Sequence, residues 1–112
     1  MVDEKYIPDR GDLIWLDFNP QAGHEQSGKR PALVISPKGY NHKTGLCIVF
    51  PITSKKKGYP FEVDISSPEV EGVVLADQIK NLDWKMRNAR FIRKADEVAV
   101  EETINLFNTL IS

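Results

Sequence analysis

Three short stretches of the chain carry the side chains that chemistry needs. The first, residues 23–31, offers the Glu25 carboxylate, the His24 imidazole and the Arg30 guanidinium in a loop that begins with a glycine. Pro31 stiffens the chain after Arg30, so the guanidinium is held at the junction of loop and strand, where its planar fork can bind a phosphate. On residue types alone, an exposed ion pair of Glu25 with Arg30 is an equally good interpretation.

The second and third stretches place polar groups at the ends of apolar runs. Residues 51–57 end in the hydroxyls of Thr53 and Ser54 and three lysines, and residues 75–79 contain Asp77 and Gln78. Hydroxyls at a strand end can donate hydrogen bonds to phosphate oxygens. For Ser54 and Asp77, a turn or a cap is the simpler interpretation. In residues 75–79, one of the two polar side chains should face a pocket or an interface.

These stretches, in this order, resemble the MazF/PemK family of toxin endoribonucleases. The resemblance covers nearly the whole chain and is carried by residues 8–15, 23–32, 40–41, 43–45, 51–54, 57–62 and 75–80. A match this long and collinear is far more specific than one short motif. It implies a homodimeric, SH3-like small antiparallel β barrel with a C-terminal helix. It also implies cleavage of single-stranded mRNA at short sequence motifs and inhibition by a cognate, MazE-like antitoxin.

The resemblance also implies roles for individual residues. It places the family's catalytic arginine on Arg30, its catalytic threonine on Thr53 and its loop glutamate on Glu25. The substrate-binding residues expected beside them are His24, Gln26, Ser54, Lys57 and Gln78. The chain departs from close relatives at His24, where a serine is frequent, and in a terminal helix that is shorter.

RNA supplies its own nucleophile, the 2'-hydroxyl, so the protein needs to position it, accept its proton, stabilise the phosphorane and protonate the leaving oxygen. Two histidines and one cysteine without a His/Cys cluster predict neither a metal site nor a cofactor. Glu25 is the simplest general base and His24 an alternative acid, whereas in the family the arginine and threonine share both roles. The expected products are a 2',3'-cyclic phosphate and a 5'-hydroxyl.

The charge is distributed unevenly along the chain, although the net charge is only -1. Residues 26–61 hold seven basic residues and no acid, and residues 80–94 are again rich in lysine and arginine. If both stretches fold onto one surface, they form a groove for a phosphate backbone; otherwise they are solvated faces. The same groove would attract an inhibitor with an acidic, disordered segment.

The apolar pattern predicts a mainly β chain that ends in a helix. A length of 112 residues favours a single domain over residues 1–112. Apolar clusters bounded by Gly, Pro and Asn predict strands near residues 11–18, 31–36, 46–53, 60–65, 72–79 and 89–94. After Ala95, Val100, Ile104, Phe107 and Ile111 follow helical spacing, with Glu101 and Glu102 near the helix start. Trp15, Phe18 and Tyr40 are candidate stacking platforms for bases.

No targeting segment or membrane span is visible in the sequence, which favours a cytoplasmic location. Cys47 lies in an apolar run and is expected to be buried. Two other functions fit the same fold: a CcdB-like toxin that poisons DNA gyrase, and a nucleic-acid-binding module without catalysis. The pair Arg30 and Thr53, together with an end that lacks the aromatic, glycine and isoleucine tail expected of CcdB-like proteins, favours the nuclease.

Overall fold

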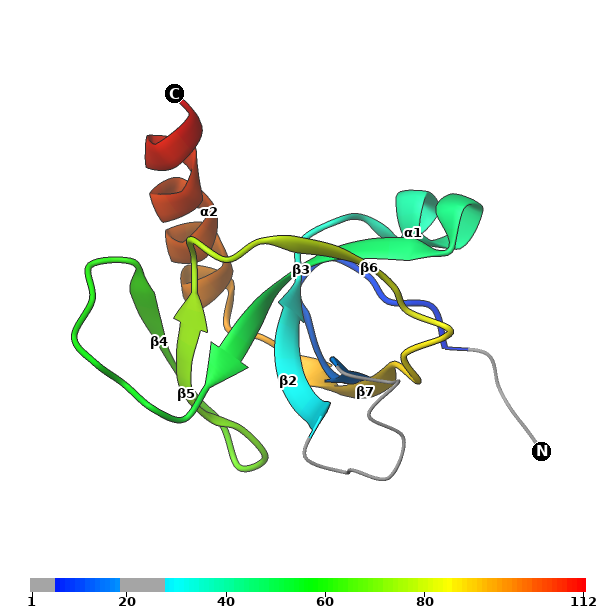
Figure 1. Ribbon diagram of the computed structural model, residues 1–112, viewed down its shortest axis with the longest axis horizontal. Coiled ribbons are helices and arrows are strands. Elements are labelled where there is room, and N and C mark those ends of the chain that lie inside the picture. The colour runs from blue at the N-terminus through cyan, green and yellow to red at the C-terminus, as the bar shows by residue number, and fades with distance from the viewer. Residues whose placement is uncertain (1–5, 19–27) are drawn as a thin grey trace.

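The fold is a curled antiparallel sheet that forms a half-barrel, with one long helix packed beside it (Figure 1). The predicted class, a small mainly β barrel with a C-terminal helix, is therefore confirmed. The computed structural model describes residues 6–18 and 28–112. Its elements are β1 (Asp12–Asp17), β2 (Lys29–Val34), α1 (Lys38–Thr44), β3 (Leu46–Thr53), β4 (Glu62–Ser66), β5 (Glu71–Leu75), β6 (Lys80–Asp83), β7 (Arg90–Lys94) and α2 (Glu97–Ile111).

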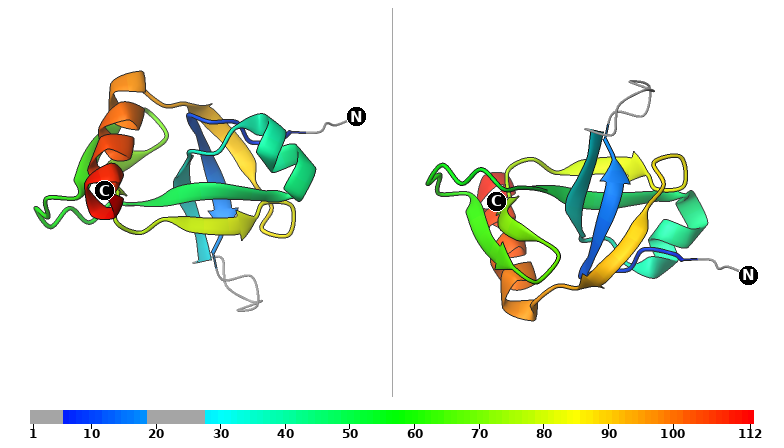
Figure 2. Two further views of the ribbon diagram at one scale, coloured as in Figure 1. Left: turned by 90° about the horizontal axis from the view of Figure 1, so that it is seen from above. Right: turned by 90° about the horizontal axis from the view of Figure 1, so that it is seen from below.

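Strand β3 links the two parts of the sheet. The strand order among the described residues is β4-β5-β3-β2-β1-β7, and β6 also pairs with β3. The first half of β3 pairs with β6, from Leu46 to Val49, whereas its last two residues, Ile52 and Thr53, pair with β5. The end of β3 therefore lies where the half-barrel meets the β4-β5 hairpin, as both views of Figure 2 show.

Strands β1, β2 and β3 contain long apolar runs because both faces of these strands are buried over much of their length. Side chains of a strand alternate between its faces, so Leu13 and Leu33 enter one core while Ile14 and Val34 enter another. The outer core lies between the half-barrel, the hairpin and α2, and the inner core fills the half-barrel. Cys47 belongs to the inner core and is 0% exposed, so its predicted burial is confirmed. Burial raises the pKa of its thiol to about 12.

Helix α2 covers the outer core with the predicted stripe. Asp96 caps its first turn by accepting a hydrogen bond from the backbone of Val98, so the helix starts before Glu101 and Glu102. Ile104 and Phe107 pack on the outer core, and the Phe107 ring meets Phe50 edge-on at 5.5 Å. The last member of the stripe, Ile111, is 66% exposed because the helix extends beyond the sheet at that point.

Three elements differ from the sequence-based prediction. Residues 38–44, for which the sequence pattern predicts no helix or strand, form the short helix α1 between Pro37 and Gly45, and Gly45 adopts the left-handed conformation. The predicted strand 72–79 ends at Leu75, and Gln78 donates its backbone N–H to Leu75 in a turn. Residues 80–83 then form the unpredicted strand β6, whose one inward apolar side chain, Leu82, gives too weak a pattern to read.

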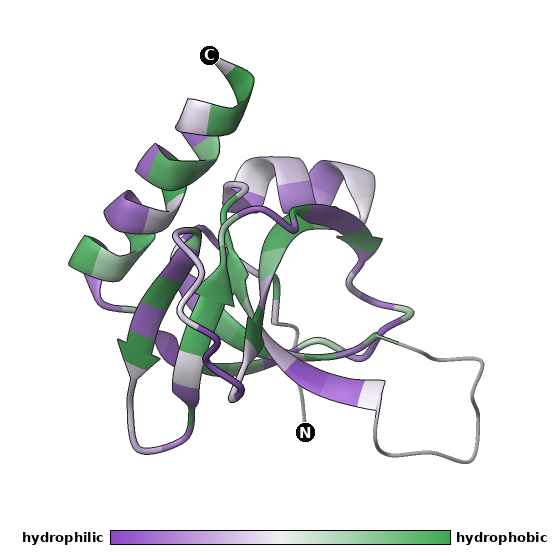
Figure 3. Ribbon diagram, turned by 60° about the vertical axis from the view of Figure 1, so that its left-hand side comes forward, coloured by the Kyte–Doolittle hydropathy of each residue, from purple (hydrophilic) through white to green (hydrophobic). Residues whose placement is uncertain are grey.

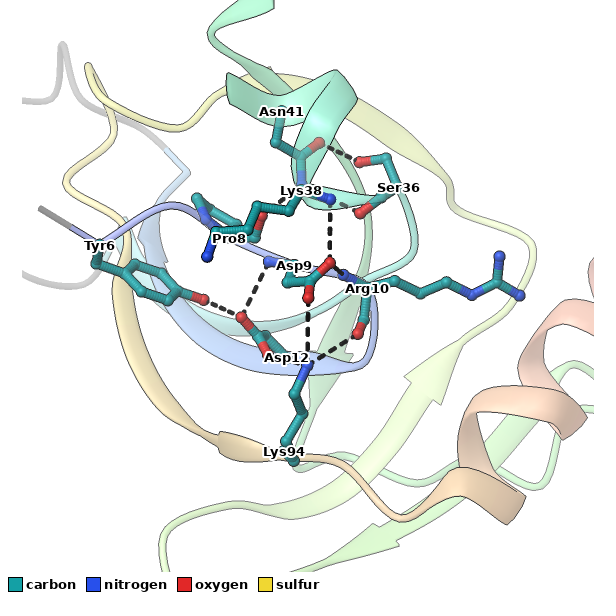
Figure 4. Close-up of polar contacts among 9 residues, drawn as sticks. All are labelled: Tyr6, Pro8, Asp9, Arg10, Asp12, Ser36, Lys38, Asn41 and Lys94. Atoms are coloured by element: carbon teal, nitrogen blue, oxygen red, sulfur yellow. Dashed lines mark hydrogen bonds and ion pairs between the residues drawn. The ribbon is translucent and has the colours of Figure 1, made fainter. Parts of the chain in front are cut away.

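A cluster of polar side chains secures the segment before β1 and is called here the N-terminal polar cluster (Figure 4). Asp12 is 3% exposed and accepts hydrogen bonds from the Tyr6 hydroxyl and from the backbone N–H of Asp9. The Lys94 ammonium lies 2.7 Å from the other oxygen of Asp12. Asn41, which is 0% exposed, donates to the carbonyl oxygens of Pro8 and Ser36, and the Ser36 hydroxyl donates back to it. The cluster therefore ties the segment before β1 to β7 and α1.

No helix among the described residues is long and apolar enough to cross a membrane.

Candidate active site at the ends of β2 and β3

The register of the sheet brings Arg30 and Thr53 to the same end of the β2-β3 pair. β2 and β3 pair antiparallel from Val34 opposite Val49 to Ala32 opposite Pro51. Two residues further along each strand, Arg30 and Thr53 lie on the same face as that last pair, because side chains alternate along a strand. The ladder ends before them, so the two strands open into a mouth. Figure 3 shows the hydrophilic start of β2 at this point, beside the grey trace.

Thr53 is fixed by its neighbours on both sides. Its hydroxyl oxygen accepts a hydrogen bond from the backbone N–H of Lys55 at 3.1 Å, which orients the side chain and leaves its O–H free to donate. Across the sheet it pairs with Val73 of β5. Gly72, which precedes Val73, lies so close to the Thr53 backbone that an added Cβ would be 2.1 Å from the Thr53 carbonyl oxygen. A glycine is therefore needed for β5 to hold the end of β3 in this position.

Two clefts meet at this mouth, and both are lined by Arg30, Ile52 and Thr53. The outer cleft, of about 520 Å³, opens toward the β4-β5 hairpin, and the inner cleft, of about 380 Å³, opens toward the half-barrel. Both volumes fall within the ~300–1,000 Å³ typical of ligand sites. The outer cleft is completed by Trp15, Lys29, Pro31, Ser54, Lys55, Glu69, Val70 and Glu71, and the inner cleft by Phe18, Pro51, Leu75, Gln78, Lys80, Leu82 and Arg87.

The inner cleft has the character of a phosphate site. Its charged lining residues are Arg30, Lys80 and Arg87, all cations. The Arg87 guanidinium also donates to the carbonyl oxygens of Asp17 and Phe18, at 3.1 and 2.8 Å, which fixes its position. Arg30 and Lys80 form no ion pair with any other described residue. Among the described residues, no carboxylate neutralises either of these two charges.

The structure brings together four of the predicted site residues. Arg30 and Thr53 line both clefts, Ser54 lines the outer cleft and Gln78 lines the inner one, where its exposed side chain follows β5. The expectation that a polar side chain of residues 75–79 faces a pocket therefore holds for Gln78. Lys57 lines neither cleft, and its ammonium lies 5.9 Å from the ring centre of Tyr59. His24, Glu25 and Gln26 lie outside the described residues.

The two basic stretches contribute to the mouth only in part. The first supplies Lys29, Arg30 and Lys55, and the second supplies Lys80 and Arg87. Three other members are ion-paired: Lys56 lies 2.8 Å from Asp64, Arg93 lies 2.9 Å from Glu69 of the outer cleft, and Lys94 joins the N-terminal polar cluster. Lys29 also lies 3.6 Å from Asp17, so the cleft cations without an ion pair to a described residue are Arg30, Lys55, Lys80 and Arg87.

Two carboxylates of the outer cleft were missed by the sequence reasoning. Glu69 and Glu71 flank Val70 at the start of β5, in a part of the sequence that reads only as a polar turn. No local motif marks them, because the pairing of β5 with the end of β3 is what brings them to the mouth. Of the candidate stacking residues, Trp15 and Phe18 line the clefts, whereas the Tyr40 hydroxyl accepts a hydrogen bond from Asn81 away from them.

Among residues 6–18 and 28–112, no group of three or more His, Cys, Asp or Glu side chains is arranged to hold a metal ion.

Residues 9–111 match the family model described as PemK-like, MazF-like toxin of type II toxin-antitoxin system. The endoribonuclease toxin MazF of Escherichia coli is 54% identical over 98 residues, which cover 88% of this chain and 86% of that protein. The endoribonuclease PemK of Escherichia coli is 30% identical and spans 100% of this chain and 88% of its own.

Solved structures give the same result. The crystal structure of MazF (Form-I) from Deinococcus radiodurans has a TM-score of 0.86 and 49% identity, covering 96% of this chain and 98% of that chain. The MazE-MazF (Form-II) structure from the same organism has a TM-score of 0.86 at 42% identity, with the same coverage. This chain, in which β2 and β3 separate at Arg30 and Thr53, therefore belongs to the PemK-like, MazF-like family of toxins of type II toxin-antitoxin systems.

Proposed function

We propose that this protein is an endoribonuclease toxin that cuts single-stranded mRNA at specific sequences by attack of the 2'-hydroxyl on the adjacent phosphate. The observation that carries the proposal is that Arg30 and Thr53 both line each of the two clefts that meet at the ends of β2 and β3. The relatives named above as endoribonucleases support it. A ligand chain can pass from one cleft to the other with its phosphate at the shared residues.

Arg30 and Thr53 act on the scissile phosphate. The Arg30 guanidinium neutralises the charge that grows on the equatorial oxygens, and the free O–H of Thr53 donates to one of them. Lys80 and Arg87 hold the neighbouring phosphate in the inner cleft. The 2'-oxygen forms a bond to phosphorus, the bond to the 5'-oxygen breaks, and the products are a 2',3'-cyclic phosphate and a 5'-hydroxyl.

The proton transfers are assigned to the loop before β2. Glu25 accepts the proton of the 2'-hydroxyl and His24 donates to the leaving oxygen; alternatively, Arg30 and Thr53 divide these roles. Gln26 and Lys57 contact the substrate beyond the mouth, Ser54 contacts it in the outer cleft and Gln78 in the inner cleft. Since all these groups come from the protein and the RNA, the reaction proceeds without a metal ion or another cofactor.

The decisive experiment uses a mixed-sequence RNA with the purified protein in EDTA. We expect cleavage to continue, with new 5'-hydroxyl and 2',3'-cyclic phosphate ends mapped by sequencing. A matched substrate with a single 2'-deoxy nucleotide on the 5' side of the scissile phosphate should resist cleavage, because it lacks the nucleophile. Equal cleavage of that substrate, or of an all-DNA analogue, would exclude the transesterification mechanism.

We also propose that the protein is a cytoplasmic homodimer neutralised by a MazE-like antitoxin, by analogy with the MazE-MazF structures of Deinococcus radiodurans. An acidic, disordered segment of the antitoxin would compete with RNA for the cations of the inner cleft. Titrating the antitoxin against a non-cleavable RNA analogue should displace the RNA. Simultaneous tight binding of both ligands at every site would contradict a shared groove.

A further inference from the structure

The two clefts at the mouth differ in the kinds of charged residues that line them. The inner cleft has only cations among its charged lining residues, whereas the outer cleft has two carboxylates, Glu69 and Glu71, beside its cations. A carboxylate repels a phosphate at close range. The carboxylate wall of the outer cleft is therefore suited to a part of an RNA chain other than its backbone.

The rest of the outer cleft offers an apolar floor and a flat wall. Its floor contains Ile52 and Val70, which are 2% and 5% exposed. Its wall contains the half-buried Trp15, which the sheet register holds between Pro31 of β2 and Arg90 of β7. Bases of single-stranded RNA are bound by such surfaces, because each base stacks on an aromatic ring and hides its face from water.

Glu71 is placed to read the edge of a base in this cleft. It lies two residues before Val73, the register partner of Thr53, so its side chain is on the same face of the sheet as those of Val73 and Thr53. Its side chain is exposed and makes no ion pair with a described residue, whereas Glu69 is held by Arg93 at 2.9 Å. Of the two carboxylates, Glu71 is thus the one with its oxygens available.

An ionised carboxylate can only accept hydrogen bonds. Adenine, cytosine and guanine each carry an exocyclic amine that donates, whereas uracil presents carbonyl oxygens on either side of its one N–H. Glu71 would accept from an amine and would repel the uracil oxygens. A carboxylate therefore selects bases with an exocyclic amine chiefly because it repels uracil.

We infer that the outer cleft binds a base next to the scissile phosphate, stacked on Trp15, and that Glu71 selects a base with an exocyclic amine over uracil. The inference rests on the proposed nuclease function and adds a specificity-determining residue to it. Lys29 and Lys55, which line the same cleft, offset the charge of Glu71 toward the RNA as a whole. Glu71 therefore changes which RNA is cut more than how much RNA is bound.

The first test compares cleavage profiles of the wild type, Glu71→Gln and a control, Glu102→Gln, which changes an exposed carboxylate on α2. Each protein cuts a randomised RNA library, and the new ends are sequenced. We expect uracil to be depleted at one position beside the wild-type cut. Glutamine can donate as well as accept, so Glu71→Gln should raise the uracil preference there about tenfold. The control should match the wild type.

The second test changes the RNA and leaves the fold intact. In a preferred substrate, the amine at that position is replaced by hydrogen, using purine riboside for adenosine, inosine for guanosine or a 4-deamino analogue for cytidine. We expect kcat/KM of the wild-type protein to fall about tenfold, the cost of one lost base contact. The loss should be less than twofold for Glu71→Gln, because the partner of the amine is already changed.

Two results would overturn the inference, and they can be told apart from failure of the nuclease proposal. Efficient cleavage by Glu71→Gln with an unchanged profile at every position would remove Glu71 from base selection while the nuclease function stood. Equal sensitivity of wild type and variant to amine removal would do the same. Absence of cleavage by the wild type on the library would remove the proposed function itself.

Discussion

Two polar regions of the molecule contain charged side chains but differ in whether these side chains are buried and paired. In the N-terminal polar cluster, Asp12 is 3% exposed and is surrounded by the hydroxyl, the ammonium and the backbone N–H that it binds. At the mouth of β2 and β3, Arg30 and Lys80 are exposed and form no ion pair with a described residue. In the N-terminal polar cluster the polar groups bind one another and stabilise the fold. At the mouth the cations have no described partner and are suited to bind a ligand.

The largest expected effect is at the mouth. Replacing Arg30 by alanine should lower kcat by about 100 to 1,000 fold, because a donor to the charged transition state is lost. The free energy of unfolding should stay the same, since no described residue depends on Arg30 for an ion pair. The measurement is single-turnover cleavage beside urea unfolding.

Arg10→Ala is the matched control for that variant, because Arg10 is also exposed but lies before β1, away from both clefts. It should retain wild-type cleavage. A folded Arg30→Ala protein with near-wild-type kcat would show that Arg30 is not a catalytic residue.

The opposite behaviour is expected in the N-terminal polar cluster. Asp12→Ala leaves the Tyr6 hydroxyl without its acceptor and removes the nearest carboxylate of the Lys94 ammonium, so we expect a loss of roughly 2 kcal/mol in the free energy of unfolding. The cleavage rate per folded molecule should not change. Asp64→Asn removes an exposed ion pair with Lys56 and should cost under ~0.5 kcal/mol. Equal stability of the two variants would contradict the structural role of Asp12.

Alkaline pH should weaken the fold. Burial and the hydrogen bond to Asp12 hold the pKa of Tyr6 well above its ordinary value of 10.0, and burial raises the pKa of Cys47 from 9.0 to about 12. Above pH 9 the unfolded chain therefore releases protons that the native protein retains, so stability is full below pH 9 and falls as the pH rises toward 12. For Cys47 the loss at pH 10 is on the order of 1 kcal/mol.

Urea unfolding between pH 8 and 11 measures this loss. Cys47→Ala should begin from a lower stability but lose less between pH 8 and 10, and Tyr6→Phe should lose less above pH 10. If both variants followed the wild-type slope, the pKa shifts of these two groups would not be the cause.

The smallest effect is expected for Lys80, a cation of the mouth that binds the substrate but takes no part in catalysis. Lys80→Ala should raise KM a few fold with kcat unchanged, and it should reduce the slope of log KM against log salt by about 0.7, the value for one phosphate contact on a single strand. Lys43→Ala changes an exposed lysine on α1 outside both clefts and should leave KM unchanged. An unaltered salt slope for Lys80→Ala would remove Lys80 from the phosphate site.

The parts of the fold that the sequence predicts well are those with strong apolar patterns. The runs that became β1, β2 and β3 are continuous because each strand packs against two cores, and the helical spacing of Val100, Ile104 and Phe107 marks α2. The weak elements escaped prediction. Helix α1 has seven residues and buries only Asn41, although Pro37 and Gly45 bracket it, and β6 has one inward side chain, Leu82.

The candidate site divides in the same way. Arg30 and Thr53 are named by the sequence because each belongs to a local stretch with a family resemblance, and chain neighbours carry that information. Their placement at the same end of β2 and β3 depends on strand register, and the charge of Arg93 is paired with Glu69, 24 residues away in the sequence. Glu71 reaches the outer cleft only because Gly72 lets β5 lie against the end of β3. Local patterns thus determined which residues can bind or act on a phosphate. The tertiary structure decided which of them face the ligand, because strand register and ion pairing join residues that are far apart in the sequence.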